Sequence, residues 1–292
     1  MYWIPITIVA AGLQVARNAT QRSLMDGAGP WGATLVRFLF GLPFSIAFVL
    51  TAVALTPGVA LKPSPAFFAF CAVGAVSQVA GTAALLVCMQ RSSFAIGSSL
   101  QQSLLPFTAV MGQFLFGDLL NVPAWVGVAA VTVGVFGLSW PKGGFRGDWS
   151  AAAFGLAAGF SFAIGNNVFR QATLALDAAH LVAASTATVC LVQALQSALL
   201  VAVLAALNRP ALMAALRSWR PSLGAGFFGA AASCCWFTAL AMAPAGPVRA
   251  VGVVEMPIAA LAGRKLFAER LTLLQWASAA LTAAGVVLAA LA

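Results

Sequence analysis

The chain has 292 residues, of which 62% are hydrophobic and 7% are charged, and its mean hydropathy is +0.99. A soluble domain is about 45–50% apolar and about 25% charged, because it needs charges to cover its surface. The composition therefore excludes an ordinary soluble globule and indicates a protein whose partner is the lipid bilayer. The formal net charge of +9 comes from 15 scattered Lys and Arg residues, so we expect no nucleic-acid partner.

Ten stretches of the chain are long and apolar enough to be membrane spans. A helix needs about 20 mostly apolar residues to cross a hydrocarbon core about 30 Å thick. The predicted spans are 3–21, 31–55, 66–89, 94–116, 122–140, 150–170, 179–207, 222–242, 246–267 and 272–291. No Lys or Arg precedes the first span, so we expect it to be retained as a helix. The sequence predicts an all-α, multi-pass protein integral to the plasma (inner) membrane, with ten transmembrane helices.

The second half of the chain repeats the first at a constant offset of 151 residues. Matching pairs include Pro106 and Pro257, Gly112 and Gly263, Asp118 and Glu269, Trp125 and Trp276, and Gly134 and Gly285. We therefore predict two five-helix repeats, at 1–141 and 148–292. Because five is odd, the second repeat enters the membrane from the opposite side, and the repeats are inverted. Inverted repeats with a site at their interface are typical of transporters.

The repeated motif is Pro…Ala…Gly…Leu-Phe-x-Asp/Glu, followed by a helix that runs from Trp to Gly-Val. Its fullest form is Glu255-Met256-Pro257-Ile258…Leu266-Phe267-Ala268-Glu269. Over essentially its whole length, the chain resembles the EamA-type branch of the drug/metabolite transporter superfamily. The pair Arg37-Phe38, early in the second span, belongs to the same resemblance. The resemblance implies an exporter and leaves its substrate open.

Sparse polar side chains form stripes on several predicted spans. Intramembrane polar groups are costly unless they face another helix or a water-filled cavity. We interpret the stripes as the lining of a neutral cavity that binds the carboxylate and ammonium of a zwitterion. For each residue the alternative is a hydrogen bond between helices, worth roughly 0.6 kcal/mol. The candidate substrate-binding residues are Gln14, Asn18, Gln78, Thr82, Ser99, Gln102, Asn167 and Trp236.

Two prolines and three charges also fall inside predicted spans. Pro106 and Pro257 each remove a backbone hydrogen bond, so we expect a kink or gate at the repeat interface, or else a static bend. An unpaired charge there costs at least about 2.5 kcal/mol, so Arg37, Arg249 and Glu255 need a partner or water. Glu255 is the candidate for proton coupling or for binding a substrate ammonium, and an anchor between helices is the alternative.

Arg37 is the candidate partner of Glu255. Arg249 lies six positions before Glu255, which is about 120° away around a continuous helix. We therefore do not expect Arg249 and Glu255 to stack.

Enzyme motifs are missing from the sequence. It has no G-x-x-x-x-G-K-[ST] and no G-x-S-x-G, a single histidine and dispersed carboxylates, so we expect no enzyme, metal or cofactor. We predict a secondary transporter that exports small metabolites, chiefly amino acids, including aromatic or neutral ones. The alternatives are a multidrug or other metabolite exporter of the same superfamily and an intramembrane enzyme. The oligomeric state is left open.

The orientation of the termini is also open. Loops after odd-numbered spans hold eleven Lys and Arg residues against two after even-numbered spans. The positive-inside rule then places both termini outside, whereas the family resemblance implies termini inside.

Overall fold

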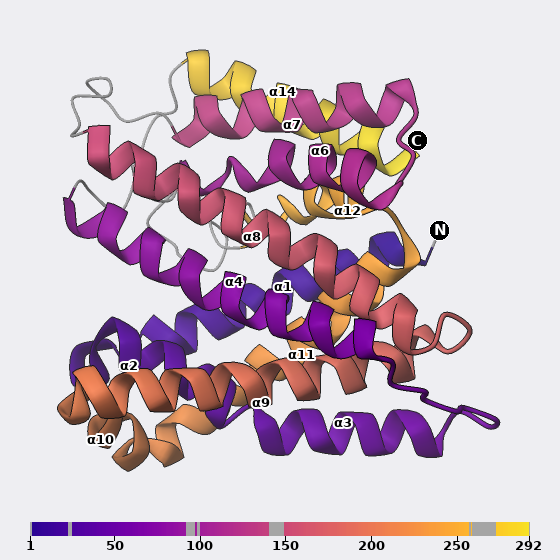
Figure 1. The fold of residues 1–292 in the computed structure, drawn as a ribbon. Coiled ribbons are helices and arrows are strands. Elements are labelled where there is room, and N and C mark those ends of the chain that lie inside the picture. Colours follow the sequence, from indigo (N-terminus) through magenta and orange to yellow (C-terminus); the bar gives the residue numbers. More distant parts are fainter. Residues whose placement is uncertain are drawn as a thin grey trace. The chain divides into compact units, whose positions relative to one another are not determined.

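The computed structural model describes residues 2–22, 25–91, 97, 100–139, 149–256, 258 and 273–291. These residues are helical apart from short connections and contain no strand (Figure 1). The predicted all-α class is therefore confirmed. In chain order the helices are α1 (Trp3–Arg22), α2 (Met25–Leu39), α3 (Leu42–Ala54), α4 (Pro65–Arg91), α6 (Leu104–Phe116), α7 (Val122–Ser139), α8 (Trp149–Leu176), α9 (Leu181–Leu207), α10 (Arg209–Arg217), α11 (Trp219–Met242), α12 (Ala245–Gly252) and α14 (Leu273–Leu291).

Five helical stretches in the described residues are long and apolar enough to cross a membrane. They are Trp31–Ala54, Pro65–Arg91, Trp149–Leu176, Leu181–Leu207 and Trp219–Met242. Three apolar helices are shorter, Leu104–Phe116, Val122–Gly137 and Trp276–Leu291. The length and composition of these helices are those of a membrane protein, and the full set of ten spans stays a prediction.

Polar caps and prolines set where several helices begin. The Ser64 hydroxyl accepts from the Phe67 N–H at 3.2 Å, before α4. The amide oxygen of Asn121 accepts from the Ala124 N–H at 2.9 Å, at the start of α7. Such caps accept from N–H groups that have no acceptor within the helix. A proline in the first turn has no N–H, and because an N–H at that position would have no acceptor within the helix, no helix hydrogen bond is lost.

Several predicted span bounds differ from the structure. The second span is divided between α2 and α3 at Phe40 and Gly41, where Pro43 in the first turn of α3 starts a new helix. The sixth continues beyond 170, to Leu176. The eighth predicted span begins earlier, at Trp219. A short helix, α10, precedes this span, and Asn208 is the N-terminal cap of α10.

The chain forms two compact units. The first unit is Met1–Val76 with Val168–Met242, and the second is Ser77–Asn167 with Ala243–Ala292. Each unit takes helices from both halves of the sequence, because the chain passes between units within α4 and α8. The repeat boundaries at 1–141 and 148–292 stay a prediction.

In the first unit, α1 packs against α11, and α9 packs against α2, α3 and α11. The junction between α2 and α3 lies directly on α11, because a methyl group added at Gly226 would lie 2.9 Å from the Gly41 nitrogen. Phe169 of α8 stacks on Phe237 of α11, with ring centroids 4.4 Å apart. Close backbone contact and stacked aromatic rings therefore hold this unit together.

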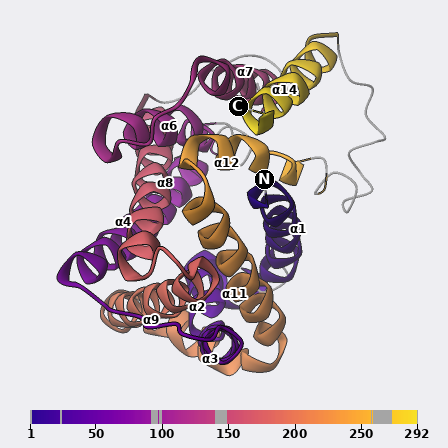
Figure 2. The same ribbon diagram turned by 90° about the vertical axis from the view of Figure 1, so that its right-hand side faces the viewer.

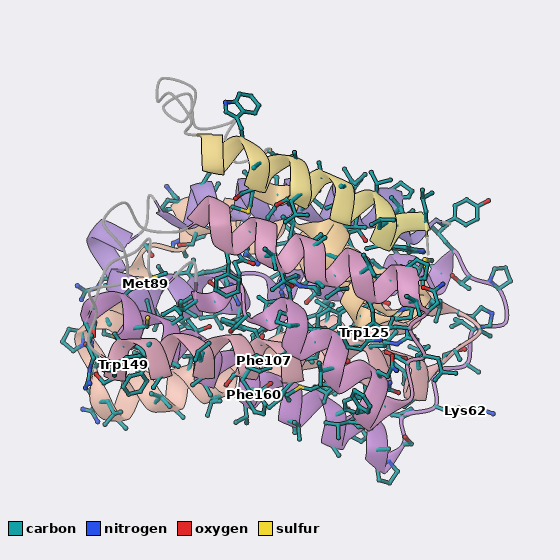
Figure 3. The ribbon with its side chains drawn as sticks, turned by 90° about the horizontal axis from the view of Figure 1, so that it is seen from above. Lys62, Met89, Phe107, Trp125, Trp149 and Phe160 are labelled. Carbon is teal, nitrogen blue, oxygen red and sulfur yellow. The ribbon has the colours of Figure 1, made fainter. Side chains whose placement is uncertain are left out.

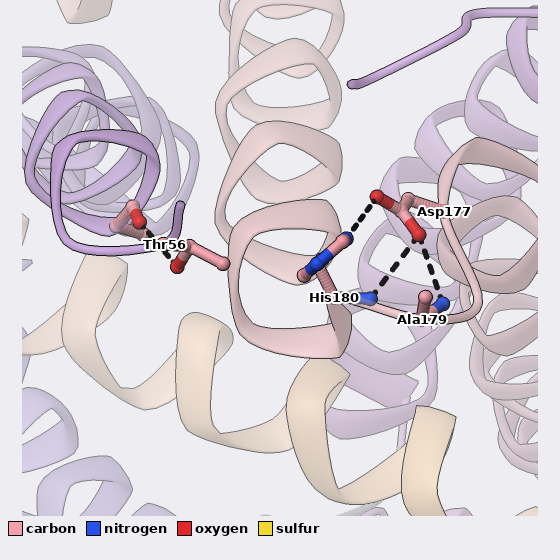
Figure 4. A network of polar contacts seen from close by, with 5 residues as sticks. Thr56, Asp177, Ala179 and His180 are labelled. Atoms are coloured by element: carbon pink, nitrogen blue, oxygen red, sulfur yellow. Dashed lines mark hydrogen bonds and ion pairs between the residues drawn. The ribbon is translucent and has the colours of Figure 1, made fainter. Parts of the chain in front are cut away.

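The connection between α8 and α9 is held by Asp177 (Figure 4). One oxygen of its carboxylate accepts from the backbone N–H groups of Ala179, at 2.8 Å, and His180, at 3.1 Å. The other lies 2.8 Å from Nδ1 of His180. The hydrogen bond from His180 lowers the pKa of Asp177 below its ordinary value. Asp177 thereby closes the turn and stays ionised at neutral pH.

In the second unit, α6, α7, α12 and α14 share a core of small and branched apolar side chains. Leu104 and Leu105 of α6 belong to it, with Val131 and Val135 of α7. On α6 and α8, Phe107 and Phe160 meet edge to face at 5.6 Å (Figure 3). The core buries one face of each of these helices.

Helices α7 and α14 lie side by side (Figure 2) and approach closely at glycines. A methyl group added at Gly134 would lie 2.8 Å from the Thr282 nitrogen, and one added at Gly285 would lie 2.7 Å from the Val131 nitrogen. Real Cβ atoms do not approach other heavy atoms so closely, so only glycine fits at either position.

The contact between α7 and α14 is reciprocal. Gly134 and Gly285 are partners at the offset of 151 residues, and so are Val131 and Thr282. Gly134 therefore contacts Thr282, and its repeat partner Gly285 contacts Val131, which is the repeat partner of Thr282. Gly127 of α7 meets Ala289 near the end of α14, whereas the later Gly134 meets the earlier Thr282, so the two helices are antiparallel.

Two turns also recur at the offset of 151 residues. Residues 102–103 interrupt the fourth predicted span and residues 253–254 interrupt the ninth. In the first turn, the Ser103 N–H donates to the Leu100 carbonyl at 3.1 Å, and the Leu105 N–H donates to the Gln102 carbonyl at 3.0 Å. In the second turn the same two bonds recur, from Val254 to Val251 at 3.1 Å and from Met256 to Val253 at 2.9 Å. The two segments therefore share a local backbone conformation as well as a sequence pattern.

The fourth predicted span is interrupted at residues 102–103, one turn before Pro106. Pro106 has no N–H to donate to the carbonyl of Gln102, four residues earlier, and this carbonyl accepts instead from the Leu105 N–H at 3.0 Å. Within α6, which begins at Leu104, Pro106 lies in the first turn and removes no hydrogen bond. A gate at Pro106 stays a prediction, and Pro257 lies outside the described residues.

Replacing Gly134 tests the contact between α7 and α14. We expect Gly134→Ala to lower the free energy of unfolding by about 1–3 kcal/mol, because the added methyl forces the two helices apart. The measurement is thermal unfolding of the purified protein in detergent. Gly12→Ala in α1 is the matched control, because a methyl group there meets nothing within 4 Å. Equal stability of the two variants would contradict this packing.

Candidate functional site

The structure describes all but one of the predicted substrate-binding residues, and they fall in both units. The first unit holds Gln14, Asn18 and Trp236, with the charged Arg37. The second holds Gln78, Thr82, Gln102 and Asn167, with the charged Arg249 and Glu255. Ser99 lies outside the described residues, as Pro257 does.

In the first unit, Gln14 and Trp236 come together across 222 positions of sequence. The indole Nε1–H of Trp236 donates to the amide oxygen of Gln14 at 3.0 Å. Trp236 is buried, with 6% of its surface exposed. This bond joins α1 to α11, which run antiparallel because Thr20, later on α1, lies against the earlier Gly224 of α11. Two predicted site residues are therefore direct neighbours, and what they bind stays a prediction.

The same face of α1 carries Arg17, which sequence reasoning did not place in the site. Its guanidinium donates to the amide oxygen of Asn18 from Nε at 3.2 Å and from Nη2 at 2.9 Å. In the sequence, Arg17 is one of the eleven Lys and Arg residues assigned to loops after odd-numbered spans. Its position three residues after Gln14 is the signal that it shares the polar stripe.

Arg37 of α2 comes close to Arg17 beside α11. A methyl group added at Gly229 would lie 3.7 Å from Cδ of Arg17 and 3.7 Å from Cβ of Arg37. The two positive charges repel each other. The Arg37 guanidinium lies over the Phe38 ring, with Cζ 4.2 Å from the ring centroid. Its Nε is buried and makes no hydrogen bond within the part of the chain that the structure describes.

In the second unit, Asn167 joins α8 to α6. This fully buried amide donates from Nδ2 to the backbone carbonyl of Ala163 at 3.0 Å and to that of Thr108 at 3.1 Å. The neighbouring Asn166 donates to the Thr108 hydroxyl at 3.2 Å. The Oδ1 atom of Asn167 faces Gly112 and accepts no hydrogen bond from the described residues. These contacts favour the interhelical alternative for Asn167.

Thr82 and Gln78 lie one turn apart on α4. The Thr82 hydroxyl donates to the Gln78 carbonyl at 2.9 Å. A hydroxyl satisfied by its own helix is common in membrane spans, so Thr82 needs no other partner.

Arg249 and Glu255 do not lie on one continuous helix, because α12 ends at Gly252 and a turn at Val253 and Val254 follows. The angle of about 120° around a continuous helix therefore does not apply to this pair. Their opposite charges attract each other, and the expectation that they do not stack stays a prediction.

Arg170 has a structural role that sequence reasoning missed. Its Nη1 donates to the carbonyls of Leu240, at 2.6 Å, and Ala241, at 3.0 Å. These carbonyls belong to the last turn of α11, where helix carbonyls have no intrahelical donor. The signal in the sequence is Pro244, which predicts that α11 ends there.

Comparisons with known proteins inform the fold alone. No family model matches the chain, and no curated protein matches it. A solved structure described as "Crystal structure of protein" is similar, with a TM-score of 0.70 and 17% identity over 100% of this chain and 99% of that chain. The helical fold thus recurs, over its full length, in an experimentally determined protein.

Replacing Asn167 tests its role as a link between α8 and α6. We expect Asn167→Ala to lower the free energy of unfolding by about 1–3 kcal/mol, because the Thr108 carbonyl loses a buried donor. Asn18→Ala is the control, since Asn18 is exposed and we expect a change within about 0.5 kcal/mol. Thermal unfolding measures both, and a larger loss for Asn18→Ala would contradict the assignment.

Proposed function

We propose that the protein is a secondary transporter that exports small metabolites. Amino acids, including aromatic and neutral ones, are its foremost substrates. Transport proceeds by alternating access through a central cavity between two inverted repeats of five spans each, in the plasma membrane. The observation that carries the proposal is the reciprocal, antiparallel contact between α7 and α14.

Exchanging two antiparallel helices requires a two-fold axis perpendicular to both of them. If α7 and α14 cross the bilayer, that axis lies in the membrane plane. This is the relation between inverted-topology repeats, which are a transporter architecture. The turns at 102–103 and 253–254, with their matching hydrogen bonds, support the same register. We accordingly propose a place in the EamA-type branch of the drug/metabolite transporter superfamily.

Interrupted helices give such a repeat a place to bind substrate. Transporters commonly bind substrates where a spanning helix breaks and its backbone groups turn toward the site. Gln102 lies in the first of the two turns, and Glu255 directly follows the second. In this proposal Glu255 exchanges its attraction to Arg249 for a substrate ammonium.

Counterflow in proteoliposomes tests the proposed function. Vesicles loaded with unlabelled L-phenylalanine should transiently accumulate labelled L-phenylalanine, and the label should remain chemically unchanged. We expect Gln14→Leu to slow this exchange severalfold, because the variant leaves the Trp236 N–H without its acceptor. The control is Thr132→Val in α7, whose hydroxyl bonds only its own helix, to Val128 at 2.7 Å.

Two results would contradict this function. If none of the twenty amino acids and no common antibiotic exchanges, the exporter proposal fails. Chemical conversion of the label would indicate an enzyme.

Replacing Glu255 tests its role in the proposed cycle. We expect Glu255→Gln to slow counterflow by about tenfold or more, because the substrate ammonium loses a charged hydrogen-bond partner. Glu255→Asp should restore part of the rate. Counterflow is measured across a pH series for each variant. An unchanged, pH-insensitive rate in Glu255→Gln would exclude both proton coupling and ammonium binding by Glu255.

A further inference from the structure

The short helix α10 joins two helices that are long enough to span a membrane. Helices α9 and α11 have 27 and 24 residues, whereas α10 has 9 (Figure 1). At 1.5 Å per residue α10 extends about 14 Å, which is less than half of a hydrocarbon core about 30 Å thick. If α9 and α11 cross the bilayer, α10 lies at the membrane surface, where the chain turns back.

Hydrogen bonds at both ends of α10 make it a separate helix. At its start, the Asn208 amide oxygen accepts from the Ala211 N–H at 3.1 Å, and the Asn208 N–H donates to the Leu204 carbonyl of α9 at 2.9 Å. At its end, the Ser218 hydroxyl donates to the Ala215 carbonyl at 2.9 Å. These bonds satisfy groups that helix ends leave open, so the side chains of α10 keep a defined helical arrangement.

The outward face of α10 combines cations with apolar side chains. The opposite face holds the fully buried Ala215, and α10 packs against α2 and α9. Arg209, Met213 and Arg217 follow one another at intervals of one turn on the outward face, and all three are exposed. Leu216 is exposed beside them. Apolar side chains favour hydrocarbon and arginines avoid it, so the boundary between lipid headgroups and acyl chains suits both.

The connection between α9 and α11 has a positive charge that no residue within it neutralises. It carries Arg209, Arg217 and Arg220 and contains no Asp or Glu. Within the described residues, none of these three arginines forms an ion pair. Cζ of Arg220 lies 5.2 Å from the ring centroid of Trp219, which is exposed at the start of α11. Trp is enriched at the level of the headgroups, so this pair fits the same boundary.

We propose that α10 and the start of α11 form a binding surface for an anionic phospholipid of the bilayer. The lipid phosphate accepts charged hydrogen bonds from the exposed arginines, and the acyl chains cover Met213 and Leu216. Charge complementarity selects an anionic headgroup over a zwitterionic one. The proposal depends on the membrane class of the protein and is independent of the proposed transport.

Binding is tested on the purified full-length protein in a neutral detergent. The probe is phosphatidylglycerol, and phosphatidylcholine with the same acyl chains is its zwitterionic counterpart. At constant ionic strength, phosphatidylglycerol should raise the Tm with a saturable concentration dependence, and phosphatidylcholine should raise it less. High salt should weaken the effect of phosphatidylglycerol, because salt screens charges at a surface.

Variants of the arginines test where the lipid binds. Each arginine near an anionic surface is worth about fivefold in affinity, so Arg217→Gln should weaken phosphatidylglycerol binding about fivefold. Replacing Arg209, Arg217 and Arg220 together by Gln should weaken it by about tenfold or more. The matched control is Lys62→Gln, which removes an exposed cation from the connection between α3 and α4 and should leave binding unchanged.

Two further measurements separate lipid binding from folding. Without lipid, Arg217→Gln should unfold at the same Tm as the parent protein, because Arg217 is exposed and bonds no other described residue. Met213→Gln keeps every charge and should still weaken phosphatidylglycerol binding severalfold, since the acyl chains lose an apolar contact.

Four results would overturn the surface. Equal Tm shifts with phosphatidylglycerol and phosphatidylcholine would remove the preference for an anion, and undiminished binding in the triple arginine variant would place the lipid elsewhere. An equal shift with soluble glycerol phosphate would make the ligand a free phosphate. A dimer in detergent that Met213→Gln dissociates would assign this face to a second copy of the chain.

Discussion

In helices as apolar as these, a polar group finds its partner inside the protein, because the hydrocarbon offers none. Most polar side chains follow this constraint closely. The hydroxyls of Thr82 and Thr132 donate to carbonyls of their own helices, and Arg170 takes up two carbonyls at the end of α11. Among the described residues, the Nε of Arg37 and the Oδ1 of Asn167 belong to a small set of buried side-chain atoms that depart from this pattern and make no hydrogen bond.

The same solvent changes how helices are held together. Lipid is as apolar as leucine, so close van der Waals packing replaces the hydrophobic effect between helices, and small residues allow it. Gly134 and Gly285 bring α7 and α14 together, and Gly226 seats the junction of α2 and α3 on α11. The glycines of the repeated motif therefore have a mechanical role, and the symmetry of the sequence becomes visible as a reciprocal contact.

The start of a helix is a local feature, and residue patterns predicted several of the starts. The predicted span 122–140 matches α7, and 272–291 matches α14, because a proline or a loop bounds each apolar run. The break at Phe40 and Gly41 was missed. The turns at 102–103 and 253–254 contain no glycine or proline of their own, but each lies one turn before a proline of the repeated motif, Pro106 or Pro257. A proline cannot donate to the carbonyl four residues earlier, so these prolines are the signal in the sequence for the two breaks.

The sequence by itself determined the solvent of this protein, its all-helical class and the internal repeat, because composition and periodicity act along the chain. It also picked out Gln14, Trp236 and Arg37 as polar groups that need an explanation. Only the tertiary structure decided which of them meet. The bond between Gln14 and Trp236 spans 222 positions, and Arg17 approaches Arg37 because antiparallel packing of α1 on α11 brings Arg17 beside Gly229. Such pairings depend on the register between helices, which close packing at glycines sets and which no single helix encodes.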